Sequence, residues 1–123
     1  MKKMILTLML VLIAGISFAG GEQDRSEAFN GPSIIIVNNT GFTIYWVYTS
    51  PFNSGSWGSP RLSKNEPLLN GKSIALQLPT AAAGENRYSI RLEDSDGDTY
   101  TKSNLSISDG DRIIFTFDDI DKQ

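Results

Sequence analysis

The chain has 123 residues, enough for one domain with its own hydrophobic core, and its 11 Lys and Arg against 14 Asp and Glu give a net charge of −3. It contains neither histidine nor cysteine, which excludes Ser-His-Asp and Cys-His catalysis, disulfide bonds and zinc sites built from Cys and His. The acidic balance and the lack of a basic cluster argue against nucleic acid and anionic lipid as partners.

Residues 1–19 have the features of a cleaved bacterial signal peptide. Lys2 and Lys3 precede an apolar segment over residues 4–18, and Ser17 and Ala19 are the small residues of a cleavage site. The apolar segment is shorter than the about 20 residues that span a bilayer. Cleavage after Ala19 leaves 104 of the 123 residues and removes two of the 11 basic side chains, so nine remain against 14 acidic ones, a net charge of −5. Because no cysteine follows the apolar segment, the sequence predicts a secreted or periplasmic protein without a membrane anchor.

Residues 20–33 are polar, rich in glycine and without periodicity, which predicts a flexible lead-in. Residues 34–37 are continuously apolar and β-branched, as in a strand covered on both faces. Residues 42–49 alternate, and the face expected to form the core carries Phe42, Ile44, Trp46 and Tyr48. The Asn-Asn-Thr-Gly segment at 38–41 is typical of a turn, so the two strands are predicted to form a hairpin.

A loop rich in Ser, Gly and Pro is expected over residues 50–60, followed by a less regular segment over 61–70. Residues 72–78 alternate again and end at Pro79, which has no N–H for a strand ladder. The inward side chains of this strand are expected to be Ile74, Leu76 and Leu78.

The last strands are separated by acidic turns. Residues 87–94 alternate, and their inward side chains are expected to be Tyr88, Ile90 and Leu92. Residues 94–98 predict a tight turn into a strand at 99–107. Residues 109–111 predict a second hairpin turn into residues 112–117. The inward side chains of that strand are expected to be Ile113, Phe115 and Phe117.

No segment after residue 19 has a sustained helical period, and the short strands recur with turns between them. This pattern predicts an all-β Greek-key β-sandwich of six to seven short antiparallel strands over residues 34–119, with a small β-barrel as the alternative. The long connection over residues 50–70 favours the sandwich, because it suits a crossover between sheets. An acidic tail over residues 120–123 closes the chain.

A spaced series of short motifs extends over the same region: Asn38-Asn39-Thr40-Gly41, Ser50-Pro51, Trp57-Gly58, Leu69-x-Gly71, Leu78-Pro79, Tyr88-x-Ile90, the segment 94–100, and Ile114-x-Thr116-x-Asp118. This series resembles a family of small, uncharacterised exported bacterial domains. The resemblance implies a β-sandwich-like fold and secretion. It implies no activity and supplies no catalytic residues.

Three alternate aspartates in the turn at 94–98, Asp94, Asp96 and Asp98, are a candidate calcium site, because Ca²⁺ prefers six to eight oxygen ligands. The spacing is not that of an EF-hand, since the twelfth residue from Asp94 is Leu105, which has no side-chain oxygen. Further ligands would come from Asp109 and Asp111, or from Asp118, Asp119 and Asp121. Asp and Gly are also the residues that a hairpin turn requires, and the sequence favours this structural interpretation.

Trp57, in the middle of the long loop, is a candidate stacking platform for a sugar or a peptide. The residues expected to lie near it and to supply contacts are Phe52, Tyr45 and Arg61. The alternative is that Trp57 folds back and caps one end of the sandwich. Because tryptophan is well buried on average, the sequence favours the cap.

Tyr45 and Val47 lie on the face of residues 42–49 opposite to the predicted core face. If that face is exposed, the two side chains mark a surface for a partner or for self-association. The alternative is that the stems of neighbouring Arg or Lys side chains cover them. The sequence favours neither interpretation.

Together these features predict an exported, non-enzymatic binding or interaction module whose partner is an envelope protein, a peptide or a glycan. One alternative is a calcium-binding sandwich that uses Asp94, Asp96 and Asp98. The other is a small carboxylate-dependent hydrolase, which is disfavoured because short strands leave little room for a deep cleft. No cofactor other than calcium is expected.

Overall fold

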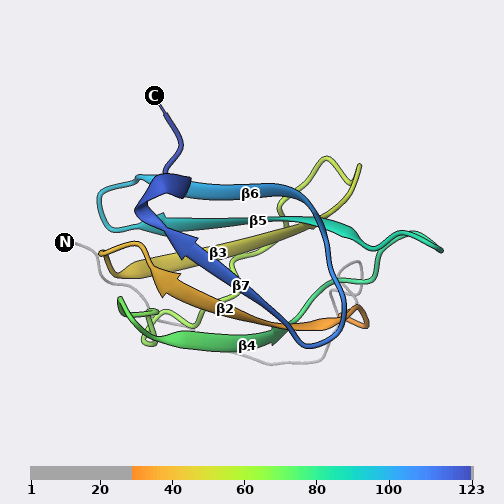
Figure 1. Cartoon of the computed structure of the whole chain (residues 1–123), viewed down its shortest axis with the longest axis horizontal. Helices are drawn as coiled ribbons and strands as arrows, with labels where there is room; N and C mark the ends of the chain where they lie inside the picture. Colours follow the sequence, from red (N-terminus) through yellow and green to blue (C-terminus); the bar gives the residue numbers. More distant parts are fainter. Residues whose placement is uncertain (1–28, 123) are drawn as a thin grey trace.

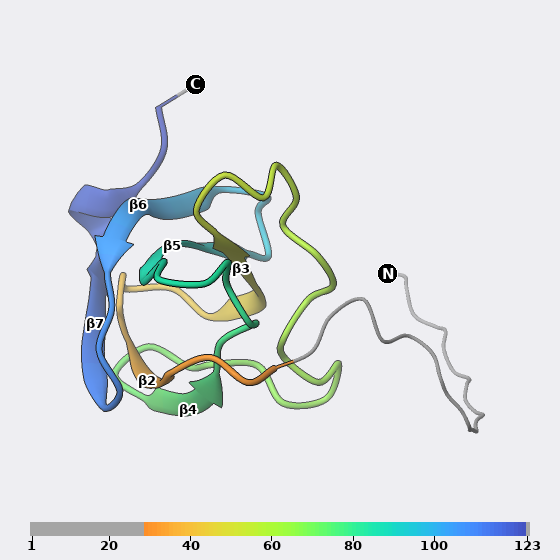
Figure 2. The ribbon, with the colours of Figure 1, turned by 90° about the vertical axis from the view of Figure 1, so that its right-hand side faces the viewer.

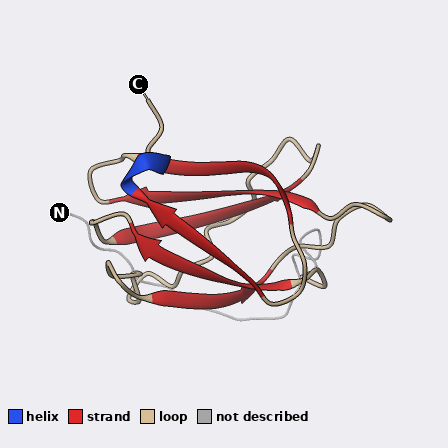
Figure 3. Ribbon diagram, viewed as in Figure 1, coloured by secondary structure: helices blue, strands red, loops and turns tan. Residues whose placement is uncertain are grey.

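The computed structural model describes residues 29–122, so the predicted signal peptide (1–19) and residues 20–28 of the predicted lead-in lie outside it. The described residues form six strands in two three-stranded sheets that pack against each other (Figures 1 and 2). The all-β sandwich predicted from the sequence is therefore confirmed. The helical segment drawn in Figure 3 is the 3₁₀ helix Phe117–Asp119, and no helix among the described residues is long and apolar enough to cross a membrane.

The first sheet has the strand order β4-β2-β7, with β2 (Ser33–Asn39) in the centre. β4 (Ser73–Gln77) pairs with β2 antiparallel, whereas β7 (Asp111–Thr116) pairs with it parallel. The sequence predicted antiparallel strands, and the parallel β2-β7 pair differs from this prediction. The chain passes from β6 in the other sheet to β7 in this one, so β7 is not joined to β2 by a hairpin. The continuous apolar run of β2 agrees with its central position, and its buried apolar side chains are Ile34, Ile36 and Val37.

The second sheet has the strand order β3-β5-β6 and is antiparallel throughout. Its strands are β3 (Ile44–Pro51), β5 (Arg87–Asp94) and β6 (Thr99–Ser106). The alternation predicted for β5 is confirmed, because buried and half-buried side chains follow one another along its whole length. Its buried apolar side chains are Tyr88, Ile90 and Leu92.

Two predicted hairpins are wrong. β2 and β3 lie in different sheets, so residues 40–43 carry the chain across the sandwich. Residues 107–110 do the same between β6 and β7. Turn residues reverse the chain direction in both places, but β2 already has a neighbour on each side and leaves no edge for β3. The tight turn predicted at 94–98 does join two paired strands, β5 and β6.

The predicted core face of β3 is correct only at its start. Ile44 is fully buried, but a β-bulge between Ile44 and Trp46 adds one residue and inverts the alternation. After the bulge, Val47 and Thr49 face the core. Trp46, predicted to face inward, is 39% exposed, and Phe42, which lies before the strand, is 46% exposed. Tyr48, also predicted to face inward, is only half-buried.

Phe117, expected to face inward at the end of the last strand, is also exposed. β7 ends at Thr116, and Phe117–Asp119 form the 3₁₀ helix η1. Thr116 caps η1: its side chain accepts a hydrogen bond from the Asp118 amide, and the Asp119 side chain accepts one from the Thr116 amide. Because η1 begins at Phe117, β7 ends one residue before the predicted end of the strand. Its inward side chains are therefore Ile113 and Phe115.

A buried polar side chain, Asn38, joins the two sheets at the end of β2. Its Nδ2 donates to the carbonyls of Phe42 (2.8 Å) and Leu68 (2.9 Å). Its Oδ1 accepts from the amide (3.0 Å) and the hydroxyl (2.7 Å) of Thr40. Because Leu68 pairs in turn with Ile44 of β3, this one amide holds the crossover and the following loop in place.

Residues 30–33, assigned from the sequence to the lead-in, are hydrogen-bonded to the domain. The Gly31 amide donates to the Leu78 carbonyl (2.9 Å), and the Leu78 amide donates to the Pro32 carbonyl (2.9 Å). A Cβ at Gly31 would lie 2.5 Å from the Pro79 carbonyl oxygen, so this approach requires glycine. The folded domain therefore begins before residue 34.

Candidate functional site

An open pocket of about 540 Å³ lies where the loop after β3 folds over the β5-β6 pair. Residues 50–57 line one side, and Ser89 of β5 with Ser103 and Asn104 of β6 line the other. We call it the β3-loop pocket. Two of the four predicted ligand-binding residues, Phe52 and Trp57, contribute to its lining. Its volume is within the range of roughly 300–1,000 Å³ that is typical of small-ligand sites.

Phe52 is held by Arg87, the first residue of β5. The Phe52 amide donates to the Arg87 carbonyl (2.9 Å), and the Arg87 guanidinium lies 3.8 Å from the centre of the Phe52 ring. Glu85 orients this guanidinium with two hydrogen bonds, at 2.9 Å and 3.1 Å. The same hydrogen bonds lower the pKa of Glu85, so its charge stays beside Arg87.

Trp57 rests on a second arginine of β5. The Arg91 guanidinium lies 4.8 Å from the centre of the Trp57 ring, and its Nε donates to the Thr101 hydroxyl (3.0 Å). Arg91 alternates with the buried Ile90 and Leu92, so its side chain is on the outer face of the sheet. Trp57 is half-buried on that outer face and is not part of the core, so it does not act as the predicted cap of the sandwich.

The other two predicted ligand-binding residues lie elsewhere. Arg61 is bonded to the framework: its amide donates to the Val47 carbonyl (2.7 Å), and its Nη2 donates to the Gln77 carbonyl (2.8 Å). Tyr45 is at the β3 bulge, 40% exposed, with its ring centre 5.9 Å from that of Trp46. Of the surface suggested by Tyr45 and Val47, only Tyr45 is exposed, because Val47 is in the core.

The sequence did not point to the β5-β6 side of the β3-loop pocket. The β5-β6 register shifts between Tyr88 and Ile90, and at this irregularity the Asn104 amide donates to the Ser89 hydroxyl (3.2 Å). Asn104 has a φ of 60° and Asn53, across the pocket, has a φ of 65°, and asparagine tolerates this left-handed conformation better than most residues. A strand irregularity leaves no mark in the local sequence pattern, so the sequence offered no signal for Ser89 and Asn104.

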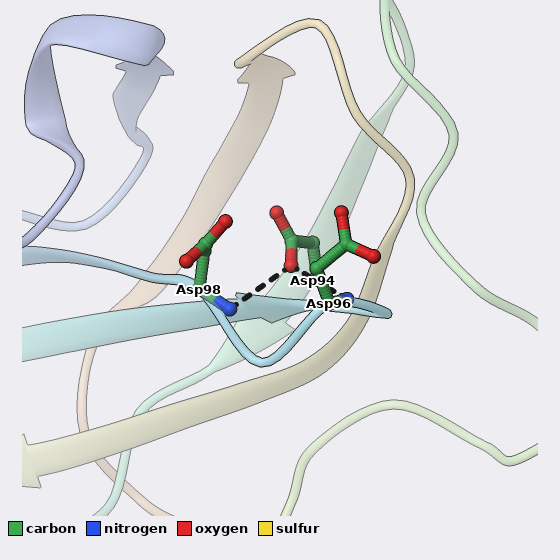
Figure 4. Close-up of side chains that lie close together, drawn as sticks. All are labelled: Asp94, Asp96 and Asp98. Carbon is green, nitrogen blue, oxygen red and sulfur yellow. Dashed lines mark hydrogen bonds between the residues drawn. The ribbon is translucent and has the colours of Figure 1, made fainter.

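The predicted calcium residues come together in the β5-β6 turn. One side-chain oxygen each of Asp94, Asp96 and Asp98 lies within 4.8 Å of the others, and Figure 4 shows the three carboxylates side by side. No further acidic side chain joins this group among residues 29–122. Two of the aspartates predicted as additional ligands are hydrogen-bonded elsewhere in the domain. Asp109 accepts from the Ser33 amide (2.8 Å), and Asp121 accepts from the Thr99 hydroxyl (2.6 Å).

The Asp94 carboxylate is occupied by the protein itself. Its Oδ1 accepts from the amides of Asp96 (2.9 Å) and Asp98 (3.1 Å), and its Oδ2 accepts from the Tyr100 hydroxyl (2.9 Å). Asp94 is only 2% exposed. Burial raises the pKa of Tyr100, and the hydrogen bond to Asp94 raises it further, so this hydroxyl keeps its proton. These contacts favour the structural interpretation, in which Asp94 closes the hairpin turn.

The comparisons with known proteins give no function. No family model matches the chain, and no curated protein matches it significantly. One similar solved structure is an NMR structure of a protein from Eubacterium rectale, with 18% sequence identity and a TM-score of 0.49 over 78% of this chain and 84% of that one. The resemblance to a family of exported bacterial domains stays a prediction.

Proposed function

We propose that the protein is an exported, non-enzymatic binding module and that the β3-loop pocket is its contact surface. The observation that carries the proposal is the placement of Phe52 and Trp57, each set against an arginine outside the core and each lining an open concave surface. Rigid aromatic side chains that remain accessible in a pocket are typical of binding surfaces.

The composition of the pocket supports binding over catalysis. Its lining among the described residues consists of Ser, Asn, Gly, Pro, Phe and Trp. A serine nucleophile needs a neighbouring base, and a carboxylate-dependent hydrolase needs two carboxyl groups that face each other. The lining supplies neither of these, and the chain has no histidine.

The test is an array that carries neutral oligosaccharides, anionic oligosaccharides and peptides. Trp57→Ala is the test variant and Trp46→Ala is its matched control, because Trp46 is also exposed but lies outside the β3-loop pocket. We expect Trp57→Ala to lose signal and Trp46→Ala to keep it. Equal signals from the two variants, or no signal from the unmodified protein, would contradict the proposal.

Export is tested separately on the protein recovered from a bacterial host with its own N-terminal segment. Cleavage after Ala19 gives a mature chain that starts at Gly20. We expect the intact mass of protein from the periplasm or the medium to match this start. Full-length protein confined to the cytoplasm would contradict the export part of the proposal.

A further inference from the structure

We infer that the β3-loop pocket binds a neutral carbohydrate, an inference that rests on the proposed function and names its ligand class. The pocket has three properties that act together. It presents two aromatic rings, it carries Ser and Asn side chains on both of its sides, and its lining contains no charged side chain among the described residues.

The lack of charge in the lining selects against ionic ligands. A phosphate, a sulfate or a uronate needs a cation within hydrogen-bond distance, and a basic peptide needs a carboxylate. The two cations that contact the rings, Arg87 and Arg91, are hydrogen-bonded to Glu85 and Thr101 respectively. The net charge of −3 for the chain further disfavours anions at a distance.

The polar groups suit a ligand with many hydroxyls. Seven of the 11 lining residues are Ser or Asn. Ser54 is used within the loop, where its hydroxyl contacts that of Ser50 (2.7 Å) and donates to the Ser56 carbonyl (3.0 Å). The side-chain amides of Asn53 and Asn104 make no hydrogen bond to another described residue, and both residues are exposed. Each amide offers a donor and an acceptor, the pair of groups that neighbouring sugar hydroxyls complement.

The rings supply the apolar part of the recognition. A pyranose has one face of C–H groups that packs on an aromatic ring, while its hydroxyls point to the edge. Neither Arg87 nor Arg91 is part of the pocket lining, so each guanidinium fixes its ring from outside the pocket. A ring held in this way loses little conformational entropy when a ligand binds.

Addition of an extended peptide to β3, the edge strand that leads into the pocket, is disfavoured, because the chain itself already pairs with Ile44 and Val47 on that edge. Peptides commonly add a strand to an exposed sheet edge. β3 is an edge strand, but the Val47 carbonyl already accepts from the Arg61 amide (2.7 Å). Ile44 and Leu68 exchange two backbone hydrogen bonds, at 2.9 Å and 2.8 Å. The segment that follows the loop therefore occupies this edge.

The experiment compares the three probe classes on the array and adds a variant that removes one amide. Asn104→Gly deletes the side chain while glycine keeps the left-handed backbone. We expect binding to neutral hexose or N-acetylhexosamine oligosaccharides, weakened about tenfold by Trp57→Ala and severalfold by Asn104→Gly, and unchanged in Trp46→Ala. Circular dichroism and the melting temperature establish that each variant is folded.

The outcomes separate the two proposals. Trp57-dependent binding to anionic oligosaccharides or peptides alone overturns the carbohydrate inference and leaves the proposed function standing. Binding to neutral oligosaccharides that is equal in Trp57→Ala and Trp46→Ala overturns both, because the β3-loop pocket is then not the site. Absence of binding to all three classes also overturns both.

Discussion

Arg91 and Trp57 form the contact that connects the framework to the β3-loop pocket. Arg91 belongs to the central strand of its sheet, and its guanidinium lies 4.8 Å from the centre of a ring that the loop carries. A hydrogen bond from Arg91 Nε to the Thr101 hydroxyl (3.0 Å) fixes the guanidinium on β6. The position of the loop ring is thus set by the rigid sheet below it.

Replacing Arg91 with Ala is expected to release the Trp57 ring. The chain has two tryptophans, so a Trp46→Phe background leaves Trp57 as the only one. In that background we expect Arg91→Ala to increase acrylamide quenching of the remaining fluorescence and to cost less than about 1 kcal/mol of stability, as exposed cation–π contacts do. Unchanged quenching would mean that Arg91 does not hold the ring.

Replacing Asn38 with Ala is expected to destabilise the fold by about 3 kcal/mol. The change leaves the Phe42 and Leu68 carbonyls and the Thr40 groups without their buried partner. Asn39→Ala is the matched control, because Asn39 is exposed, and we expect it to change stability by less than about 0.5 kcal/mol. Urea unfolding measures both variants, and a similar loss in the two would contradict the role assigned to Asn38.

The stability of the protein is expected to fall at alkaline pH. Burial raises the pKa values of Tyr88 and Tyr100, so the folded state keeps their protons more strongly than the unfolded chain does. The stabilisation is complete below the unfolded pKa of about 10 and is lost as the pH rises above it. Tyr100→Phe is expected to cost about 1–2 kcal/mol at neutral pH and to flatten the alkaline decline. A decline as steep as in the unmodified protein would contradict this assignment.

Calcium is expected to leave the melting temperature unchanged. A ligand of the native state raises apparent stability, but the Asp94 carboxylate already accepts two hydrogen bonds from amides of its own turn and one from the Tyr100 hydroxyl of β6. The measurement compares thermal unfolding with millimolar CaCl₂ and with EDTA. A clear rise with calcium would restore the calcium interpretation of Asp94, Asp96 and Asp98.

The sequence predicted the fold wherever alternation was regular. β5 alternates without interruption, and its inward apolar side chains were all assigned correctly. β3 was assigned incorrectly after Ile44, because a bulge shifts the alternation by one residue and leaves no mark in the composition. The predicted pairing of the strands on either side of residues 38–41 was also wrong. A turn motif predicts that the chain reverses its direction, but it does not predict which sheet the next strand joins.

The candidate site was predictable in part. Trp57 was found because a tryptophan is unusual in the middle of a Ser- and Gly-rich loop, and Phe52 was correctly expected to lie near it. Arg61 and Tyr45 were grouped with them by proximity in sequence, yet Arg61 bonds the framework and Tyr45 lies at the bulge of β3. Ser89 and Asn104 depend on the register of two strands distant from the loop, which local patterns do not determine.

The most direct measurement is a fluorescence titration of the Trp46→Phe protein, in which Trp57 is the only tryptophan. The probes are neutral oligosaccharides of glucose, galactose, mannose and N-acetylglucosamine, with sulfated oligosaccharides and peptides as comparisons. We expect a saturable change in Trp57 emission with at least one neutral oligosaccharide, and weaker binding in Asn104→Gly. Emission that responds to none of the neutral oligosaccharides, or a response that Asn104→Gly leaves unchanged, would contradict this expectation.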